Sequence, residues 1–216
     1  MMKKWMIILR AYSWPASLVP VVLGTVIAWR HGRFSWADFA LTFVAALLVH
    51  SAANLANTYF DFKNGVDRKE TADDRGLVDG LMTPPAMLRL ALGLFAAGAA
   101  IGLLLVFKNK VPALAWLGAA GFALAWFYTA TGFAYKYRTL GDAGIFLAFG
   151  PFIVCGTALI QARAFLPEAL WASIPVGLLI VAILHANNMR DIRGDGEARI
   201  STLASVMGLV TAKRYY

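Results

Sequence analysis

The sequence predicts an all-α fold, a polytopic bundle of transmembrane helices formed by a single domain over residues 1–216. First, 60% of the residues are apolar or aromatic and only 15% are charged, whereas a soluble domain is nearer half apolar and a quarter charged. Second, the mean hydropathy is +0.64, and one compact core could not hide that much apolar surface. Third, the apolar residues form six long runs without central charges. In hydrocarbon such runs must be helices, because strands would need a closed barrel with alternating polarity.

The runs follow one another with short charged or turn-rich segments between them. An apolar stretch at 5–9 comes first, but it is too short for a span or a cleaved signal and is broken by Arg10. The later runs are close to the roughly 20 residues that cross a bilayer. The six expected spans are 15–29, 39–57, 87–107, 112–130, 143–161 and 169–187, and a seventh is expected to begin near Ala204. Small residues inside spans let helices approach closely. Glycines of this kind inside the third to fifth spans include Gly102, Gly118, Gly121, Gly150 and Gly156.

The charged residues are divided unequally between the two ends of the spans. Thirteen Lys and Arg residues lie at one set of ends and five at the other, so the positive-inside rule places the first face and the N-terminus in the cytoplasm. Ten of the twelve acids share that face, and only Asp38 and Glu168 lie opposite. The rule is nearly indifferent to acids, so their distribution needs another cause. A long polar loop explains the acids of 70–79 but not those at the ends of spans.

Two segments resemble each other across the chain. The second span ends in NTYFDFKNGVD and the sixth in NNMRDIRGD. In both, an Asn and an Asp stand four residues apart, which puts them on one face of a helix, and a further acid follows. These residues are Asn57, Asp61 and Asp67 in the first segment, and Asn187, Asp191 and Asp195 in the second. The helix dipole disfavours a carboxylate at a helix C-terminus, so we expect a positive group to compensate.

The side chains of these two segments are of the types that bind a metal ion. Carboxylate and amide oxygens without a Cys or His pair are hard donors suited to Mg²⁺, which normally keeps waters and shares its shell with substrate phosphates. Two such clusters on separate helices therefore predict a pyrophosphate site. The basic residues expected nearby are Lys63, Lys136, Arg190 and Arg193. His50 and His185 are expected to be hydrogen-bonded helix residues rather than metal ligands.

An alternative is that the acids are helix caps and solvated loop charges. This interpretation suits Asp73, Asp74, Asp79 and Glu197. It suits two separated Asn/Asp pairs at equivalent span ends poorly, so we favour a functional role for the pairs.

Four stretches of the chain, 10–24, 54–80, 128–151 and 183–203, resemble the UbiA superfamily of intramembrane prenyltransferases, in the family's order. Within it, the resemblance is to the menaquinone branch, the 1,4-dihydroxy-2-naphthoate polyprenyltransferases and their animal UbiA-domain relatives. The resemblance implies that Mg²⁺ binds an allylic polyprenyl pyrophosphate between two Asp-rich motifs. Ionisation then leaves a carbocation that alkylates an aromatic, dihydroxynaphthoate-like acceptor, whose carboxyl group is lost. The pair of motifs is the specific part of this likeness.

The resemblance also assigns roles by motif position. The catalytic residues that it implies are Asn57, Asp61, Asp67, Asn188, Asp191 and Asp195, with the four aspartates as metal ligands. The substrate-binding residues are Lys63, Lys136 and Arg190, which contact pyrophosphate, Tyr137 and Asp142, which help to close the site, and Arg10, a basic residue before the first span.

Three features depart from the family pattern. Arg199 stands where relatives usually have Gly in the second motif. The segment YTATGFAYKY lacks the Gly-Gly pair that is common in relatives, so Lys136 is aligned only from its C-terminal side. Family members have nine spans, so the resemblance implies that this chain is C-terminally short, as a fragment, a truncated gene product or an inactive remnant.

Other functions fit less well. A CDP-alcohol phosphotransferase would need a D-x-x-D-G-x-x-A-R pattern, and the spacing of Asp191 and Asp195 differs from it. A transporter tends to place ionisable groups near the bilayer midplane, where these spans carry no Asp, Glu, Lys or Arg; an inert membrane scaffold is the other non-enzyme alternative. Nucleic-acid binding is not expected, because the net charge of +8 is spread around span ends. We expect an integral protein of the bacterial inner membrane, in contact with membrane lipid, with its active site on the cytoplasmic face. Prenyl chain length and oligomeric state do not follow from the sequence.

Overall fold

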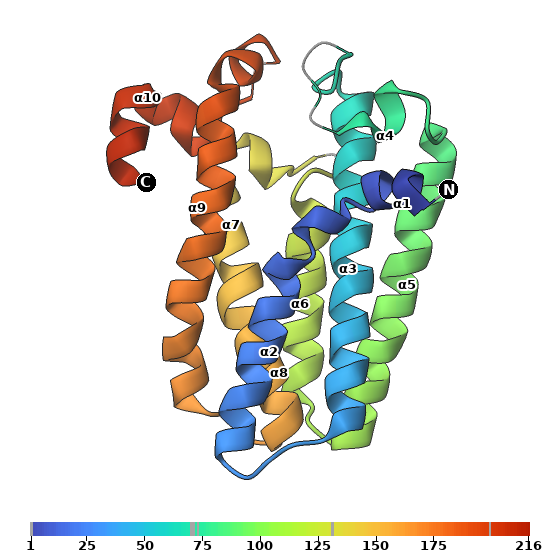
Figure 1. Cartoon of the computed structure of the whole chain (residues 1–216), viewed down its shortest axis with the longest axis vertical. Helices are drawn as coiled ribbons and strands as arrows, with labels where there is room; N and C mark the ends of the chain where they lie inside the picture. The colour runs from blue at the N-terminus through green and yellow to red at the C-terminus, as the bar shows by residue number, and fades with distance from the viewer. Residues whose placement is uncertain (1, 70–71, 73, 131, 199) are drawn as a thin grey trace.

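The protein is described here by a computed structural model that covers residues 2–69, 72, 74–130, 132–198 and 200–216. Its long helices run side by side along one axis, and the short helices α1, α4 and α10 lie toward one end of the bundle (Figure 1). The helices, in chain order, are α1 (Met2–Ile8), η1 (Ala11–Ser13), α2 (Pro15–Arg30), α3 (Trp36–Lys63), α4 (Arg75–Val78), α5 (Pro84–Asn109), α6 (Ala113–Phe127), η2 (Tyr135–Tyr137), α7 (Gly141–Leu147), η3 (Ala148–Phe152), α8 (Ile153–Ala162), α9 (Pro167–Glu197) and α10 (Leu203–Tyr215). The predicted all-α membrane fold is confirmed.

Five helical segments of the described chain are long and apolar enough to cross a membrane: Ala11–Arg30, Trp36–Lys63, Pro84–Asn109, Gly141–Ala162 and Pro167–Glu197. The fourth expected span, 112–130, corresponds to the shorter helix α6, whose 15 residues extend about 22 Å at 1.5 Å per residue. The segment Gly141–Ala162 contains α7, η3 and α8 in succession. Its π-helical turn, η3, contains Pro151, whose ring and missing N–H do not fit a regular α-helix interior.

Helices α3 and α9 extend beyond their expected ends at 57 and 187, to Lys63 and Glu197. Hydropathy indicates only the part of a helix that lies in hydrocarbon, whereas the helix continues into water as long as its backbone hydrogen bonds are made. Both motifs are therefore carried on helix ends that project past the apolar runs. A helix begins at Leu203, close to the expected start of a seventh span at Ala204; this 13-residue helix, α10, bends at Gly208 (φ 72°) and packs against α9. Figure 1 shows it beside the end of α9 that carries the second motif.

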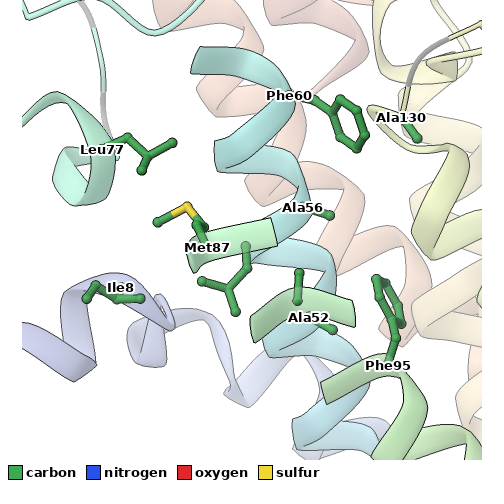
Figure 2. Close-up of a cluster of buried hydrophobic side chains, with 10 residues drawn as sticks. Ile8, Ala52, Ala56, Phe60, Leu77, Met87, Phe95 and Ala130 are labelled. Atoms are coloured by element: carbon green, nitrogen blue, oxygen red, sulfur yellow. The ribbon is translucent and has the colours of Figure 1, made fainter. Parts of the chain in front are cut away.

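A buried apolar cluster joins α1, α3, α4 and α5 close to the end of α3 that carries the first motif. Figure 2 shows Ile8 of α1 and Leu77 of α4 beside Met87 of α5, with the Ala52, Ala56 and Phe60 side chains of α3 in the same cluster. Helix α5 comes close to α3 at Gly98, where a Cβ atom would lie 2.7 Å from Val49 Cγ2. This packing holds the C-terminal half of α3 in place.

The glycines expected at helix contacts have two different roles. A Cβ atom on Gly150 would lie 2.9 Å from the Ser173 carbonyl oxygen, and one on Gly156 would lie 3.1 Å from Leu117, so these two permit close packing. Gly102 and Gly118 face open space, and a Cβ on Gly121 would meet nothing closer than 3.9 Å. These three line the central cavity described below, so the expectation of close helix contacts there is wrong.

Candidate functional site

A cavity of about 900 Å³ lies between the long helices. One end is polar and both sequence motifs reach it. The motif residues that line it are Asn57, Asp61, Asp67, Asn188, Asp191 and Asp195, together with the basic residues Arg10, Lys136 and Arg190. Beyond them the walls are largely apolar and include Val21, Leu105, Leu114, Phe122 and Phe152. Segments that are more than 120 residues apart in sequence thus face one cavity.

Asp61, at the polar end, is 4% exposed and has three hydrogen-bond donors. Lys136 Nζ lies 2.6 Å from its Oδ2 atom, and Asn57 Nδ2 donates to the same oxygen over 2.8 Å. The Tyr137 hydroxyl donates to Oδ1. Arg10 Nη1 in turn donates to Asn57 Oδ1 over 2.9 Å. The expected positive group at the end of α3 is therefore Lys136, which comes from the loop after α6.

Burial and charge change the acid–base properties of the groups at this rim. Burial lowers the pKa of Lys136, but the Asp61 carboxylate and Tyr128 together outweigh it and the pKa is raised, so the ammonium stays charged. Burial and the negative charge of Asp61 both raise the pKa of Tyr137, which therefore remains a hydrogen-bond donor. Burial and the same Asp61 charge raise the pKa of Asp67 to about 7. A cation in the cavity would favour the ionised form of Asp67.

The backbone after α3 turns back toward the cavity. Gly65 has φ +72°, a conformation that suits glycine. The Val66 and Asp67 amides then donate to the Asp61 carbonyl oxygen over 2.9 and 3.2 Å. This turn returns the Asp67 side chain to the cavity wall.

The second motif lies on the last turns of α9. The Arg190 guanidinium donates to both carboxylate oxygens of Asp191, over 2.8 and 2.7 Å. Asp195 accepts a long hydrogen bond from Thr202 Oγ1, at 3.4 Å. The Thr139 amide donates to the Ser201 carbonyl oxygen over 2.7 Å. The loop that carries Lys136 is thus joined to the segment that follows α9.

The structure places two expected substrate-binding residues away from the cavity. Lys63 is exposed, and its ammonium lies 6.0 Å from the centre of the Tyr59 ring. It follows Asp61 by two residues, a rotation of about 200° around the helix, so it projects from the opposite face. Asp142 is 5% exposed and its Oδ2 atom lies 2.9 Å from His185 Nδ1, between α7 and α9. Neither side chain lines the cavity, so this geometry does not support the expected roles of Lys63 on pyrophosphate and of Asp142 at the site entrance, which stay predictions.

The structure confirms some of the other sequence predictions and not others. Arg193 is exposed and is not among the lining residues. His50 and His185 are hydrogen-bonded, as predicted. Asp74 caps α4 by accepting from the Gly76 amide over 2.7 Å, which confirms the cap interpretation, although it also lines the cavity. Glu70, Asp73 and Arg199 lie outside the described residues.

Asn54 and Tyr128 line the cavity but were not singled out from the sequence. Asn54 lies one turn before Asn57, so a search for Asn at helical spacing on both sides of each pair would have found it. Tyr128 has no such signal.

Within the described residues, no group of three or more His, Cys, Asp and Glu side chains is close enough to hold a metal ion by itself. The four aspartates and two asparagines nevertheless line one cavity, and their oxygens are the hard donors that Mg²⁺ prefers. This donor set fits a Mg²⁺ whose shell is shared between two motifs, pyrophosphate oxygens and water, and does not form a closed protein cage.

Comparison with known proteins agrees with this architecture. The sequence model described as the UbiA prenyltransferase family matches residues 17–216. The UbiA prenyltransferase domain-containing protein 1 of Xenopus tropicalis is 39% identical over 207 residues, which are 94% of this chain and 59% of that protein. The Homo sapiens protein of the same name is also 39% identical, with coverage of 94% and 61%. The chain thus spans about three fifths of the length of these relatives.

Solved structures show the same fold at lower identity. A UbiA homolog from Archaeoglobus fulgidus, bound to GPP and Mg²⁺, has a TM-score of 0.75 at 15% sequence identity. The matched region covers 98% of this chain and 72% of the homolog. The apo structure of a UbiA homolog from Aeropyrum pernix K1 has a TM-score of 0.65 at 23% identity, with coverage of 95% and 71%.

Proposed function

The chain belongs to the UbiA prenyltransferase family, and we propose that it transfers a polyprenyl group from an allylic polyprenyl pyrophosphate to an aromatic acceptor. The acceptor that we propose is 1,4-dihydroxy-2-naphthoate, in menaquinone biosynthesis. The observation that carries the proposal is the single cavity that has both Asn/Asp motifs at its polar end and apolar walls beyond them. A charged head and a long isoprenoid tail need these two environments side by side.

The polar end suits a pyrophosphate. Asp61 and Asp67 from the first motif and Asp191 and Asp195 from the second would hold Mg²⁺ against its oxygens. When bound, Mg²⁺ would neutralise negative charge on the departing pyrophosphate. The Nζ atom of Lys136 lies 2.6 Å from Oδ2 of Asp61. Together with Arg10 and Arg190 on the same wall, it can stabilise the charge that develops as the C1–O bond breaks.

The apolar end suits the isoprenoid tail. The cavity is lined by Asp61 near one end of α3 and Thr42 near the other. These residues are 19 positions apart, or about 28 Å along a helix. An isoprene unit adds four main-chain carbon–carbon bonds of about 1.5 Å each and extends about 5 Å, so the wall is long enough for several units. Apolar walls also keep water from the allylic cation.

The acceptor is proposed from the likeness of NTYFDFKNGVD and NNMRDIRGD to the menaquinone branch. The orientation is proposed from charge: the motif-bearing ends carry the excess of Lys and Arg, which favours a cytoplasmic active-site face. We propose the bacterial inner membrane as its location.

The test uses the purified chain in detergent with Mg²⁺, a labelled polyprenyl pyrophosphate and 1,4-dihydroxy-2-naphthoate. We expect a lipophilic prenylated naphthol, identified by its mass, with loss of carbon dioxide. Release of pyrophosphate with prenyl alcohol as the sole product would reject the aromatic acceptor. Absence of both products, in a chain that binds the pyrophosphate, would support the inert-scaffold alternative.

A further inference from the structure

A buried polar pair lies in the cavity wall about two helical turns from the motifs. Ser17 of α2 and His50 of α3 are 2% and 8% exposed and both line the cavity. Ser17 Oγ lies 2.6 Å from His50 Nδ1. An ionisable side chain inside a membrane span is costly and is usually retained for function.

The surrounding hydrogen bonds determine which atoms carry protons. Ser13 Oγ donates its proton to the Arg10 carbonyl oxygen over 2.8 Å. It can therefore only accept from His50 Nε2, which lies 3.0 Å away, as it does from Asn54 Nδ2, also at 3.0 Å. In a neutral imidazole one nitrogen donates and the other accepts. Because Nε2 donates, Nδ1 is the acceptor and Ser17 Oγ is the donor in the short bond between them.

The hydrogen bonds therefore run from Ser17 to His50 and from His50 to Ser13. The imidazole base is connected to the cavity through the Ser17 hydroxyl. The Ser17 proton points at His50 Nδ1, so the Ser17 oxygen presents its lone pairs to a cavity ligand. A ligand hydroxyl that donates to Ser17 Oγ would be connected to the imidazole through one short bond. A histidine accepts the proton of a serine hydroxyl in the same way where it acts as the general base of a serine nucleophile.

The position of the pair relative to the motifs suits a bound aromatic ring. His50 precedes Asn57 by 7 residues and Asp61 by 11, or about 10 and 16 Å along α3. That interval leaves room for a pyrophosphate held at Asp61, its allylic carbon and one ring system. The Phe149 ring packs edge-on against His50, with the ring centres 5.3 Å apart, and also lines the cavity. It provides an aromatic wall at the level of the pair.

We propose that Ser17 binds a phenolic hydroxyl of the aromatic acceptor and that His50, acting through Ser17, receives its proton. This inference rests on the proposed function, and it identifies the part of the cavity in which the aromatic acceptor binds. Ser17 is the group in contact with substrate, and His50 is a positioning and proton-accepting residue behind it.

The acceptor hydroxyl proton moves to Ser17 Oγ as the Ser17 proton moves to His50 Nδ1, which leaves a phenolate and an imidazolium. The phenolate electron pair forms a carbonyl bond while a ring carbon bonds to the allylic C1, and the C1–O electron pair leaves with pyrophosphate. Pyrophosphate then takes the proton from the alkylated ring carbon, or a carboxyl group at that carbon leaves as carbon dioxide. The proton returns from His50 to the ring oxygen, which restores the aromatic hydroxyl.

The test compares a dihydroxynaphthoate with its methyl ether at the reacting hydroxyl, in the full chain in detergent. We expect wild-type transfer to fall at least tenfold with the ether. Ser17→Ala and His50→Ala should transfer to the free phenol at least tenfold more slowly than wild type and should lose most of the preference for it. Their binding of the allylic pyrophosphate, measured by calorimetry, should stay within twofold of wild type. His50→Gln keeps side-chain bulk without a base and should resemble His50→Ala.

Ser51→Ala is the matched control. Ser51 follows His50 on α3, is 4% exposed, and accepts a hydrogen bond from Trp14 Nε1 over 3.0 Å. It is not among the residues that line this cavity, so its variant should keep the wild-type preference for the free hydroxyl. If the Ser17 and His50 variants also keep that preference, the pair only joins α2 to α3 and the inference is wrong, while the proposed function stands. If wild type prenylates no phenolic acceptor, the proposed function fails and the inference fails with it.

Discussion

Lys136 Nζ and Asp61 Oδ2 lie 2.6 Å apart although 75 residues separate them in sequence. Asp61 lies in the last turn of α3 and Lys136 lies in the loop between α6 and α7. Their side chains are 5% and 20% exposed, so each charge depends on the other for solvation. This contact joins the first motif to the loop that also reaches the second.

Removing Asp61 should end turnover. We expect Asp61→Asn to lower Mg²⁺-dependent prenyl transfer at least 100-fold, because it removes a carboxylate from the pyrophosphate site and leaves Lys136 without its partner. Asp191→Asn should have a comparable effect. The measurement is initial rate at saturating Mg²⁺. Asp79→Asn is the control, since Asp79 forms an exposed ion pair with Arg75 outside the cavity; full activity in either motif variant would remove that motif from the metal site.

The two lysines near the end of α3 should behave differently. Lys136→Met should raise KM for the pyrophosphate at least tenfold and destabilise the protein by about 3 kcal/mol, the cost of leaving a buried carboxylate unpaired. Lys63→Met should change neither, because Lys63 projects from the opposite face of α3. Kinetics and thermal unfolding in detergent provide the two measurements. Equal effects of both substitutions would contradict the assigned geometry.

The glycines that line the cavity should leave space for a long isoprenoid tail. Gly102 lines the cavity and its Cβ position meets open space, so Gly102→Phe should fill the cavity without displacing a neighbour. We expect long polyprenyl pyrophosphates to lose at least tenfold in kcat/KM while geranyl pyrophosphate is little affected. Gly93→Phe is the matched control on the same helix. Gly93 also faces open space but is exposed and not part of the lining. A uniform loss for all chain lengths would indicate a folding defect instead.

Asp142 and His185 should matter for stability more than for chemistry. They are 5% and 1% exposed and bond across α7 and α9. Asp142→Ala or His185→Ala should each cost about 3 kcal/mol, because the remaining polar group stays buried without its partner. The double variant should cost less than the sum of the two. Loss of turnover in Asp142→Ala with an unchanged unfolding temperature would restore the role at the site entrance.

Metal binding should depend on the pyrophosphate. Because the described carboxylates form no cluster of three, Mg²⁺ alone should bind weakly, and a non-hydrolysable pyrophosphate analogue should tighten it at least tenfold. Calorimetry with and without the analogue measures this coupling. Chelation with EDTA should end turnover, and added Mg²⁺ should restore it. Tight Mg²⁺ binding without the analogue would indicate a preformed protein site.

The sequence determined the class of fold, the approximate spans and the two Asn/Asp motifs, because hydropathy and helical spacing are local properties. It also indicated that Asp61 needs a cation. It could not choose between Lys63 and Lys136, since that choice depends on the direction in which a helix end faces and on a loop that returns from another part of the chain. For the same reason Gly102 and Gly150 looked equivalent, although one lines a cavity and the other allows two helices to touch. The pairing of Ser17 with His50 and of Asp142 with His185 required the packing of separate helices, and only the tertiary structure decides which faces meet.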